Sequence, residues 1–356
     1  MFDLATCRQT IVVASGAEPP VRFSPDGQWL AFGDGQLVPA AGGAVTQPFG
    51  SSVQTWEWSA AGEVLGGVTE AGGVVFTTPG GEPQPLLPDG SGVRHLVFAA
   101  DGSRLAVDRA GAGIQVVDVN SGQALTVFHQ PDPALTPEVA GWSPDAQWVL
   151  YWRGPVGKEA RPLDAAPTDG GPWVNLSDPM PPYTDLISTC GDFVALSVGP
   201  GQGMSEGKQI LLTGAPEWSF HNLTHDYTRS WFWPACSTDG RWVAVVATPN
   251  RAESSNSTAP RALWVLASDG SSRTRVIPGG EDAPEFPRWS RDGQAILVIL
   301  RSGTEWSSPG SLFLVQIEPS SGKIVSTMGP IGDLGSAPGE GGRQGWAAVT
   351  DWYQPA

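Results

Sequence analysis

The chain has 356 residues, of which 40% are apolar and 16% are charged, and this is enough to bury a large hydrophobic core. It carries 36 acidic and 20 basic residues, so its formal net charge is −16. Nucleic-acid affinity comes mainly from Lys and Arg side chains that neutralise phosphates, so this charge argues against nucleic acids and anionic membranes as partners. No run of about 18 apolar residues occurs, and no membrane insertion is expected.

The chain begins with two apolar runs around a short polar turn, MFDLAT-CRQ-TIVVAS, which predict a β-hairpin within residues 1–19. This start lacks the basic and apolar regions of a signal peptide. A recurring phrase then begins, in which an aromatic or apolar residue precedes Ser, Pro-Asp-Gly or a variant, and an apolar run. Its copies start at Phe23, Trp58, Phe98, Trp142, Ile187, Cys236 and Trp289.

Each phrase predicts a hairpin of two strands, which we name a and b. Ser-Pro-Asp-Gly suits a tight turn, because Pro fixes φ at the second position, Asp bonds to the nearby backbone and Gly accepts a left-handed conformation. Second hairpins with Gly turns supply strands c and d, as at 114–128, 263–277 and 312–327. Four-stranded sheets bury both faces when copies pack face to face, so the pattern predicts β-propeller blades.

We expect a single all-β propeller domain over residues 1–356. Its four-stranded antiparallel blades start near residues 20, 55, 95, 139, 184, 232 and 286. Residues 331–356 and 1–19 are left over, and their strand-like segments predict an eighth blade closed by both termini, because leftover strands need partners. Seven blades with extra terminal strands are the alternative.

The phrase FSPDGxxLAF, with a later strand such as LWVLASDGSSRTRV, resembles the TolB-type propeller repeat, a relative of the WD repeat. The resemblance covers nearly the whole chain and implies the propeller fold. Such propellers serve as periplasmic interaction modules, as the gating domain of prolyl-oligopeptidase-type enzymes, and as lyases acting on uronate oligosaccharides. The resemblance favours an extracytoplasmic location if the start was trimmed. Few Lys with abundant Ala, Gly and Arg favour a bacterial source.

The loops that enter strand a from the preceding strand d are where a binding site is expected first, because loops carry function on a rigid scaffold. The entry to the sixth blade combines aromatic side chains with one arginine, a composition typical of interface hot spots. We expect Trp231 and Trp233 to face one side of the strand and Phe232 the other. The candidate binding residues here are Tyr227, Arg229, Trp231 and Trp233, with plain packing as the alternative.

Acidic residues recur at the same entries, at Glu18, Glu57, Glu138, Asp185, Asp226 and Glu285. If they surround the central channel, they form a negative funnel that attracts cations or the Lys and Arg side chains of a partner. Glu138, Asp185, Asp226 and Glu285 are therefore candidate binding residues. Individually solvated carboxylates are the alternative.

Metal ligands and thiols give few signals. His221 and His225 flank Asn-Leu-Thr beside Asp226 and are the metal-ligand candidates. No cofactor is predicted, and a divalent cation in the channel stays open. Cys7, Cys190 and Cys236 have neither the CxxC nor the Cys/His spacing of a zinc site, and their disulfide state is left open.

No catalytic constellation stands out, so the sequence favours a non-enzymatic, monomeric binding propeller that engages a protein or peptide through its d–a loops. A peptidase is disfavoured, because those enzymes carry a separate α/β-hydrolase domain and the repeats occupy this chain. Two alternatives remain. One is a carbohydrate-active or metal-dependent enzyme, uronate-lyase-like, with its site in the channel. The other is a propeller fragment of a larger receptor or kinase.

Overall fold

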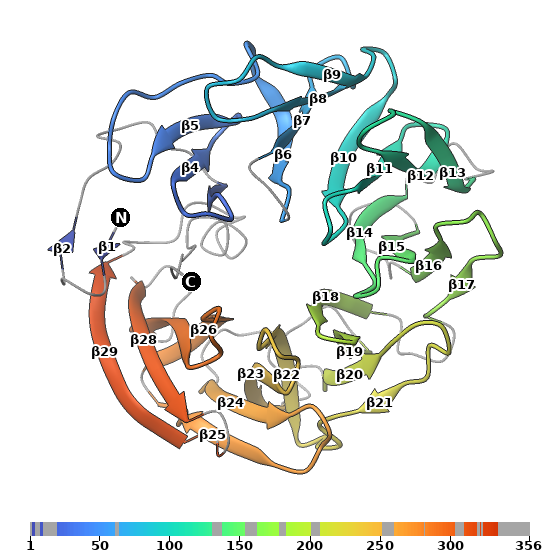
Figure 1. Ribbon diagram of the computed structural model, residues 1–356. Helices are drawn as coiled ribbons and strands as arrows, with labels where there is room; N and C mark the ends of the chain where they lie inside the picture. The colour runs from blue at the N-terminus through green and yellow to red at the C-terminus, as the bar shows by residue number, and fades with distance from the viewer. Residues whose placement is uncertain are drawn as a thin grey trace. The chain divides into compact units, whose positions relative to one another are not determined.

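The computed structural model describes most of the chain as strands joined by turns (Figure 1). The described residues divide into two compact units, of which the first ends at Leu176 and the second begins at Ser177. Within them, no helix is long and apolar enough to cross a membrane. The described residues are 2–3, 8–9, 20–60, 64–129, 137–153, 162–177, 183–200, 207–250, 260–280, 282–302, 310–318, 321 and 323–333.

The first unit contains four antiparallel sheets, blades 1 to 4, each built from strands that are consecutive in the chain. Blade 1 has three strands and, in place of a fourth, a single bridge between Leu37 and Thr46. The strands of blades 1 and 2 are β3 (Val21–Phe23), β4 (Trp29–Phe32), β5 (Gln36–Pro39), β6 (Val53–Trp58), β7 (Leu65–Thr69), β8 (Val74–Thr77) and β9 (Gln84–Leu87). Those of blades 3 and 4 are β10 (Val93–Phe98), β11 (Arg104–Arg109), β12 (Gly113–Asp118), β13 (Ala124–Phe128), β14 (Glu138–Trp142), β15 (Trp148–Trp152), β16 (Leu163–Pro167) and β17 (Val174–Asn175).

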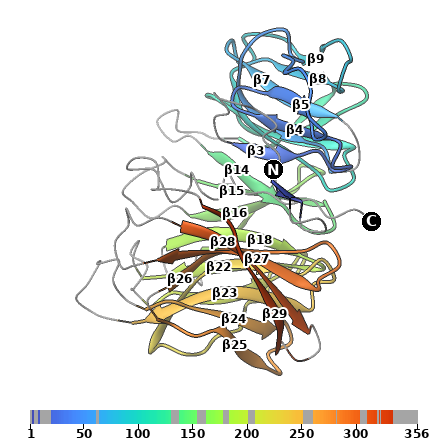
Figure 2. The same ribbon diagram turned by 90° about the vertical axis from the view of Figure 1, so that its left-hand side faces the viewer.

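The second unit contains blades 5 to 7, each with four strands. Figure 2 shows the strands of blade 6 following one another from β22 to β25. The strands of blades 5 and 6 are β18 (Tyr183–Cys190), β19 (Phe193–Gly199), β20 (Gln209–Thr213), β21 (His221–Asn222), β22 (Arg229–Cys236), β23 (Trp242–Pro249), β24 (Ala262–Ala267) and β25 (Arg273–Ile277). Those of blade 7 are β26 (Asp282–Trp289), β27 (Ala295–Ser302), β28 (Gly310–Glu318) and β29 (Lys323–Asp333).

The prediction of an all-β propeller of antiparallel blades is confirmed. In the described part of the chain the favoured eighth blade is wrong, and the alternative of seven is correct. Residues 331–333, the first of the C-terminal segment assigned to that blade, belong instead to β29, the fourth strand of blade 7. Near the start, β1 (Phe2–Asp3) and β2 (Arg8–Gln9) pair only with each other in a two-stranded sheet. Residues 334–356 of the predicted closing blade lie outside the described residues.

The recurring phrase forms the predicted turn between strands a and b, and its serine organises it. Ser237 Oγ donates to Asp239 Oδ1 at 2.6 Å and accepts the N–H of Trp242 at 3.0 Å. Asp239 Oδ1 also accepts the N–H of Arg241 at 3.1 Å. Ser24, Ser143 and Ser290 make the same serine–aspartate and serine–backbone contacts in their own blades. The turn of blade 6 has Thr in place of Pro, so proline is not required.

The first strands of blades 2 to 7 share a β-bulge, which the sequence analysis did not predict. A bulge places two residues of one strand opposite one residue of the other, bends the strand and re-aims its side chains. In blades 2 to 5 the pairing shifts near the end where the preceding loop enters, and in blades 6 and 7 it shifts in the middle of the strand. The shifts lie between Val53 and Thr55, Val93 and His95, Val139 and Gly141, Thr184 and Leu186, Phe232 and Ala235, and Glu285 and Arg288.

Apolar side chains and indole hydrogen bonds hold neighbouring blades together within each unit. Between blades 3 and 4, Ile114 packs in one buried cluster with Trp142 and Tyr151. The indole N–H of Trp142 also donates to the carbonyl of Val97 in the preceding blade at 2.9 Å. Trp289 makes the equivalent bond to Ala235 at 2.9 Å. In blades 4 and 7, the tryptophan that opens the phrase therefore joins its blade to the one before it.

A disulfide joins blades 5 and 6. It connects Cys190, the last residue of β18, to Cys236, the last residue of β22, whose Cα atoms lie 5.2 Å apart. The adjoining turns pack closely at Gly191 and Gly240. A Cβ atom at position 191 would lie only 3.1 Å from the Cα of Gly240, so the contact leaves little room for a side chain. The sequence analysis left this pairing open. Cys7 lies outside the described residues.

Candidate functional site

His95 and Asp108 form a hydrogen-bonded pair across the first two strands of blade 3. They are direct partners in the register of β10 and β11. His95 Nδ1 lies 2.8 Å from Asp108 Oδ2, and the aspartate side chain is fully buried, whereas 46% of the histidine side chain is exposed. A buried carboxylate that holds Nδ1 orients the ring and leaves Nε2 to accept or donate a proton.

Arg94 contacts the same carboxylate, because β10 is bulged at this residue. Consecutive side chains of a regular strand point to opposite faces, but the register shift lets both Arg94 and His95 reach Asp108. Arg94 Nε lies 3.3 Å from Asp108 Oδ1, an ion pair without hydrogen-bond alignment. Its Nη2 donates to the carbonyl of Pro137 at 2.9 Å. A guanidinium and an imidazole therefore flank one buried carboxylate.

Blade 4 completes the surroundings of this carboxylate. The backbone N–H of Val139 donates to Asp108 Oδ2 at 3.3 Å. The hydrogen bond to Asp108 raises the pKa of His95 above its ordinary value, burial of the ring opposes the rise, and the charges of Asp108 and Glu138 support it. The structure thus brings the predicted site residue Glu138 within electrostatic reach of His95. Histidine is the side chain whose ordinary pKa lies near neutral pH, so it can act as a general base there.

The predicted residues before blade 6 form a local turn. Asp226 Oδ1 accepts the backbone N–H of Thr228 at 3.0 Å and its hydroxyl at 2.6 Å. Arg229 Nε lies 3.4 Å from Asp226 Oδ2. Trp231 is fully buried and its indole donates to the carbonyl of Asp226 at 3.3 Å, whereas 67% of Tyr227 is exposed. Trp231 is therefore a core residue, and Tyr227 and Arg229 stay accessible.

The expectation that Trp231 and Trp233 share one side of the strand is wrong. Trp231 belongs to the core between blades 5 and 6, while Phe232 and Trp233 both pack in the core between blades 6 and 7. The bulge after Phe232 causes this, and Trp233 takes a φ of 54°. Trp233 stacks on Phe286, the residue with φ 48° in the bulge of blade 7, with ring centroids 4.2 Å apart.

The predicted acidic residues have different environments. Glu285 is fully buried and pairs with Arg261 and with Arg301, whose Nη2 lies 2.5 Å from Glu285 Oε2, so its charge is neutralised inside the sheet. Desolvation raises the pKa of the partly buried Glu57 to about 7. Asp185 is the bulged residue of β18, and its side chain lies outside the described part of the structure. Glu18 lies outside it entirely.

The metal-ligand candidates His221 and His225 lie beside each other, with ring centroids 6.4 Å apart. Among the residues that the structure describes, no group of three or more His, Cys, Asp or Glu side chains could hold a metal ion. These two histidines therefore have no third ligand of that kind in the described ranges.

The sequence contains one Gly-x-Ser-x-Gly segment, residues 203–207. In a nucleophile elbow such a serine sits between a strand and a helix. This segment instead connects β19 to β20, two paired strands of blade 5. Residues 203–206 lie outside the described residues, and this connection between strands does not support a serine hydrolase.

Sequence reasoning missed the pairing of His95 with Asp108, although a signal was present. Counting outward from the Asp-Gly turn of blade 3 pairs Phe98 with Leu105 and, three steps further, His95 with Asp108. This pair spans two strands and does not lie in a loop. The bulge that adds Arg94 has no comparable sequence signal.

No family model and no curated protein matches the chain. Solved structures do match. A prolyl endopeptidase structure has a TM-score of 0.58 at 12% identity, over 85% of this chain and 47% of that chain. An oligogalacturonate lyase in complex with manganese has a TM-score of 0.53 at 13% identity, over 79% and 77%. A putative TolB from Agrobacterium tumefaciens has a TM-score of 0.43 at 16% identity, over 72% and 86%.

At these identities the similarity shows the propeller fold. The chain spans about half the length of the prolyl endopeptidase chain that it matches. A TolB-type propeller is among the similar structures, but no family model confirms the specific repeat family.

The favoured reading of a non-enzymatic binding propeller is contradicted by these comparisons. Of the three structures described above, the two with TM-scores above 0.5 are those of enzymes, a prolyl endopeptidase and an oligogalacturonate lyase. They agree better with the enzyme that the sequence analysis kept as its alternative. That analysis failed because it sought a constellation along the sequence, whereas His95 and Asp108 meet only across a strand pair.

Proposed function

We propose that the protein is an enzyme that cleaves acidic oligosaccharides by β-elimination, with His95 as the base. The observation that carries the proposal is the contact of His95 and Arg94 with the buried carboxylate of Asp108. Each side chain is partly exposed, at 46% for His95 and 31% for Arg94, so a substrate can reach both.

The chemistry requires a base and a cation close together. Elimination from a uronate begins with loss of the proton on the carbon that bears the carboxylate, and this proton is acidic only when the carboxylate charge is neutralised. Arg94 supplies a fixed positive charge with planar donors that match a carboxylate. His95 Nε2 takes the proton, the C–H electron pair forms a double bond, and the glycosidic C–O bond breaks. The leaving oxygen then takes up a proton.

Asp108 is a positioning residue in this scheme. Its carboxylate accepts from Nδ1 of His95, so Nε2 is the nitrogen that exchanges protons. It also fixes Arg94 and is itself held by the N–H of Val139. The strand pair thus sets the distance between base and cation before substrate binds, which reduces the ordering cost of reaching the transition state.

The similarity to an oligogalacturonate lyase supports the choice of substrate class, and the repeat phrase supports a TolB-type propeller. The lyase structure contains manganese. The described residues of this chain offer no set of three His, Cys, Asp or Glu ligands, so these residues do not fit such an ion. In the proposed steps, Arg94 supplies the positive charge.

The test is the rate at which oligogalacturonate is converted to unsaturated product, followed by ultraviolet absorbance. We expect His95→Gln to lower kcat/KM by about 100- to 10,000-fold, the usual contribution of a general base. His129→Gln is the matched control, because His129 is exposed at the end of strand d of the same blade. Its activity should equal that of the unmodified protein. Equal activity of both variants would show that His95 is not the base.

A further inference from the structure

Blade 6 carries a cluster of arginines around one indole, which we call the arginine patch: Arg229, Arg273, Arg275 and Trp264. All four lie on the same face of the sheet. Trp264 and Arg275 are cross-strand partners, and Arg273 lies two residues before Arg275 on β25. Arg229 lies two residues before Trp231 on β22, and Trp231 and Trp264 meet edge to face at 5.6 Å. Alternation along strands therefore gathers these groups on one side.

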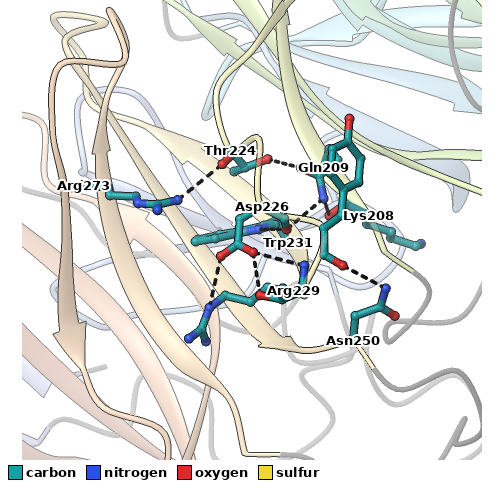
Figure 3. A network of polar contacts seen from close by, with 10 residues as sticks. Lys208, Gln209, Thr224, Asp226, Arg229, Trp231, Asn250 and Arg273 are labelled. Carbon is teal, nitrogen blue, oxygen red and sulfur yellow. Dashed lines mark hydrogen bonds and ion pairs between the residues drawn. The ribbon is translucent and has the colours of Figure 1, made fainter.

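Two of the three guanidinium groups lie over the ring of Trp264. The guanidinium carbon of Arg229 lies 5.5 Å from the Trp264 ring centroid, and that of Arg275 lies 5.9 Å from it. Arg273 Nη1 donates to the backbone carbonyl of Thr224 at 3.3 Å (Figure 3). Because like charges repel, three neighbouring guanidinium groups favour the binding of a negatively charged group between them.

One carboxylate of the described residues pairs with this cluster. Asp226 Oδ2 lies 3.4 Å from Arg229 Nε, but Asp226 Oδ1 is occupied by the N–H and hydroxyl of Thr228 (Figure 3). Three guanidiniums against one carboxylate leave two positive charges. In a chain with a net charge of −16, this is a local reversal of sign. An anion would therefore be drawn to this face more than to the rest of the surface.

The patch is accessible and has an aromatic neighbour. Arg273 and Arg275 are exposed, and each guanidinium carries five N–H donors, most of them unused by the bonds above. Tyr227, between Asp226 and Thr228, is 67% exposed, and its carbonyl is fixed by the side-chain amide of Asn250 at 3.2 Å. Rings of this kind stack on sugars, and arginines bind carboxylates in a bidentate manner.

Arginines on an edge strand also discourage pairing with other chains, and β25 is the last strand of its sheet. That role accounts for charge on β25. It does not account for Arg229, which comes from the opposite edge strand of the same sheet and lies over the same indole. Arginines from two different strands, β22 and β25, therefore lie over the same indole, as expected for a binding site.

We propose that the arginine patch is a second binding site for acidic oligosaccharide, which holds uronate carboxylates on Arg273 and Arg275 while Tyr227 packs against a sugar ring. The patch belongs to the second unit and the His95 site to the first. The choice of a glycan rests on the proposed function, whereas the anion preference rests on the patch alone.

The test is the affinity of oligogalacturonate for the His95→Gln protein, measured by calorimetry. The His95→Gln substitution is used so that the ligand is not cleaved during the measurement. Adding Arg273→Ala with Arg275→Ala should weaken binding by about tenfold or more, as expected for lost charge-assisted hydrogen bonds, and should reduce its dependence on salt. Arg241→Ala is the matched control, because Arg241 is a 71% exposed arginine in the a–b turn of the same blade. The control should bind like its parent.

Equal affinity of the double variant and the Arg241→Ala control would overturn the proposal. Equally tight binding of an acidic peptide, or of the carboxyl-reduced neutral oligosaccharide, would overturn the assignment to uronate carboxylates. The two proposals fail separately. Arginine-dependent binding without any cleavage by the unmodified protein would refute only the enzyme, and His95-dependent cleavage with patch-independent binding would refute only the patch.

Discussion

The side chain of Asp108 joins three partners that belong to different parts of the first unit. It accepts hydrogen bonds from His95 in its own blade and from the N–H of Val139 in the next blade, and it forms an ion pair with Arg94. A buried carboxylate is costly unless several donors satisfy it, so these contacts keep the charge in place. The same contacts make the protonation of His95 depend on a neighbour that the substrate does not touch.

Replacing Asp108 with Asn should change the pH dependence of His95. The hydrogen bond from His95 to the Asp108 carboxylate raises the pKa of His95, so loss of this carboxylate should lower that pKa toward its ordinary value. A base must be neutral to act, so the acidic limb of the kcat/KM profile should move to lower pH while the maximal rate falls through loss of ring orientation. Titration of the His95 ring by NMR checks the shift, with His129 as an internal control.

The same substitution should change stability in a matching pH range. A histidine with a raised pKa in the folded state stabilises the fold below its unfolded pKa, and this contribution disappears as pH rises through the folded pKa. Loss of that contribution should therefore appear in acid and fade at alkaline pH. An unchanged His95 titration in Asp108→Asn would contradict the role assigned to the carboxylate.

Strands and turns show which parts of this fold the sequence can predict. The a–b and c–d hairpins were predictable because Ser, Asp and Gly mark their turns at regular positions. The bulges of the first strands were not, because Trp233 and Phe286 take positive φ values without being glycine. Tertiary packing of their stacked rings compensates for a conformation that local preference disfavours. A bulge that the sequence did not predict also brings Arg94 to the candidate site.

The serine of the recurring turn should contribute measurably to stability. Ser237 is buried, and its hydroxyl accepts the N–H of Trp242 while it donates to Asp239. Ser237→Ala leaves both groups without this partner and should lower the free energy of unfolding by about 1 to 3 kcal/mol. Ser271→Ala, in the exposed c–d turn of the same blade, is the control. Equal denaturant midpoints for both variants would show that the hydroxyl does not organise the turn.

At the scale of the whole chain, the seven copies of the phrase correspond to the seven blades, whereas the leftover terminal residues do not form the predicted eighth among the described residues. Residues up to Asp333 belong instead to β29 of blade 7. The disulfide could not be assigned from spacing, since Cys190 and Cys236 are 46 residues apart and meet only where two blades pack. A repeat pattern predicts the contacts within each repeat, but it does not predict which residues meet between neighbouring repeats.

Reduction of the Cys190–Cys236 bond should destabilise the second unit. Closing a loop of this length restricts the unfolded chain, and its loss should cost about 2 to 4 kcal/mol. Thermal unfolding with and without reductant measures this. The Cys190→Ala/Cys236→Ala protein should be insensitive to reductant, which serves as the control. Identical melting in both conditions, with free thiols detected at both positions, would contradict the bond.

At the largest scale, we propose that His95 and Arg94 make this propeller a lyase for acidic oligosaccharides. Mass spectrometry of the products from a defined oligogalacturonate tests it most directly. Elimination adds no water, so the two product masses should sum to the substrate mass, with one unsaturated sugar at the new end. His95→Gln should slow the formation of both products by about 100- to 10,000-fold. Intact substrate, or products that together weigh one water more than the substrate, would contradict the claim.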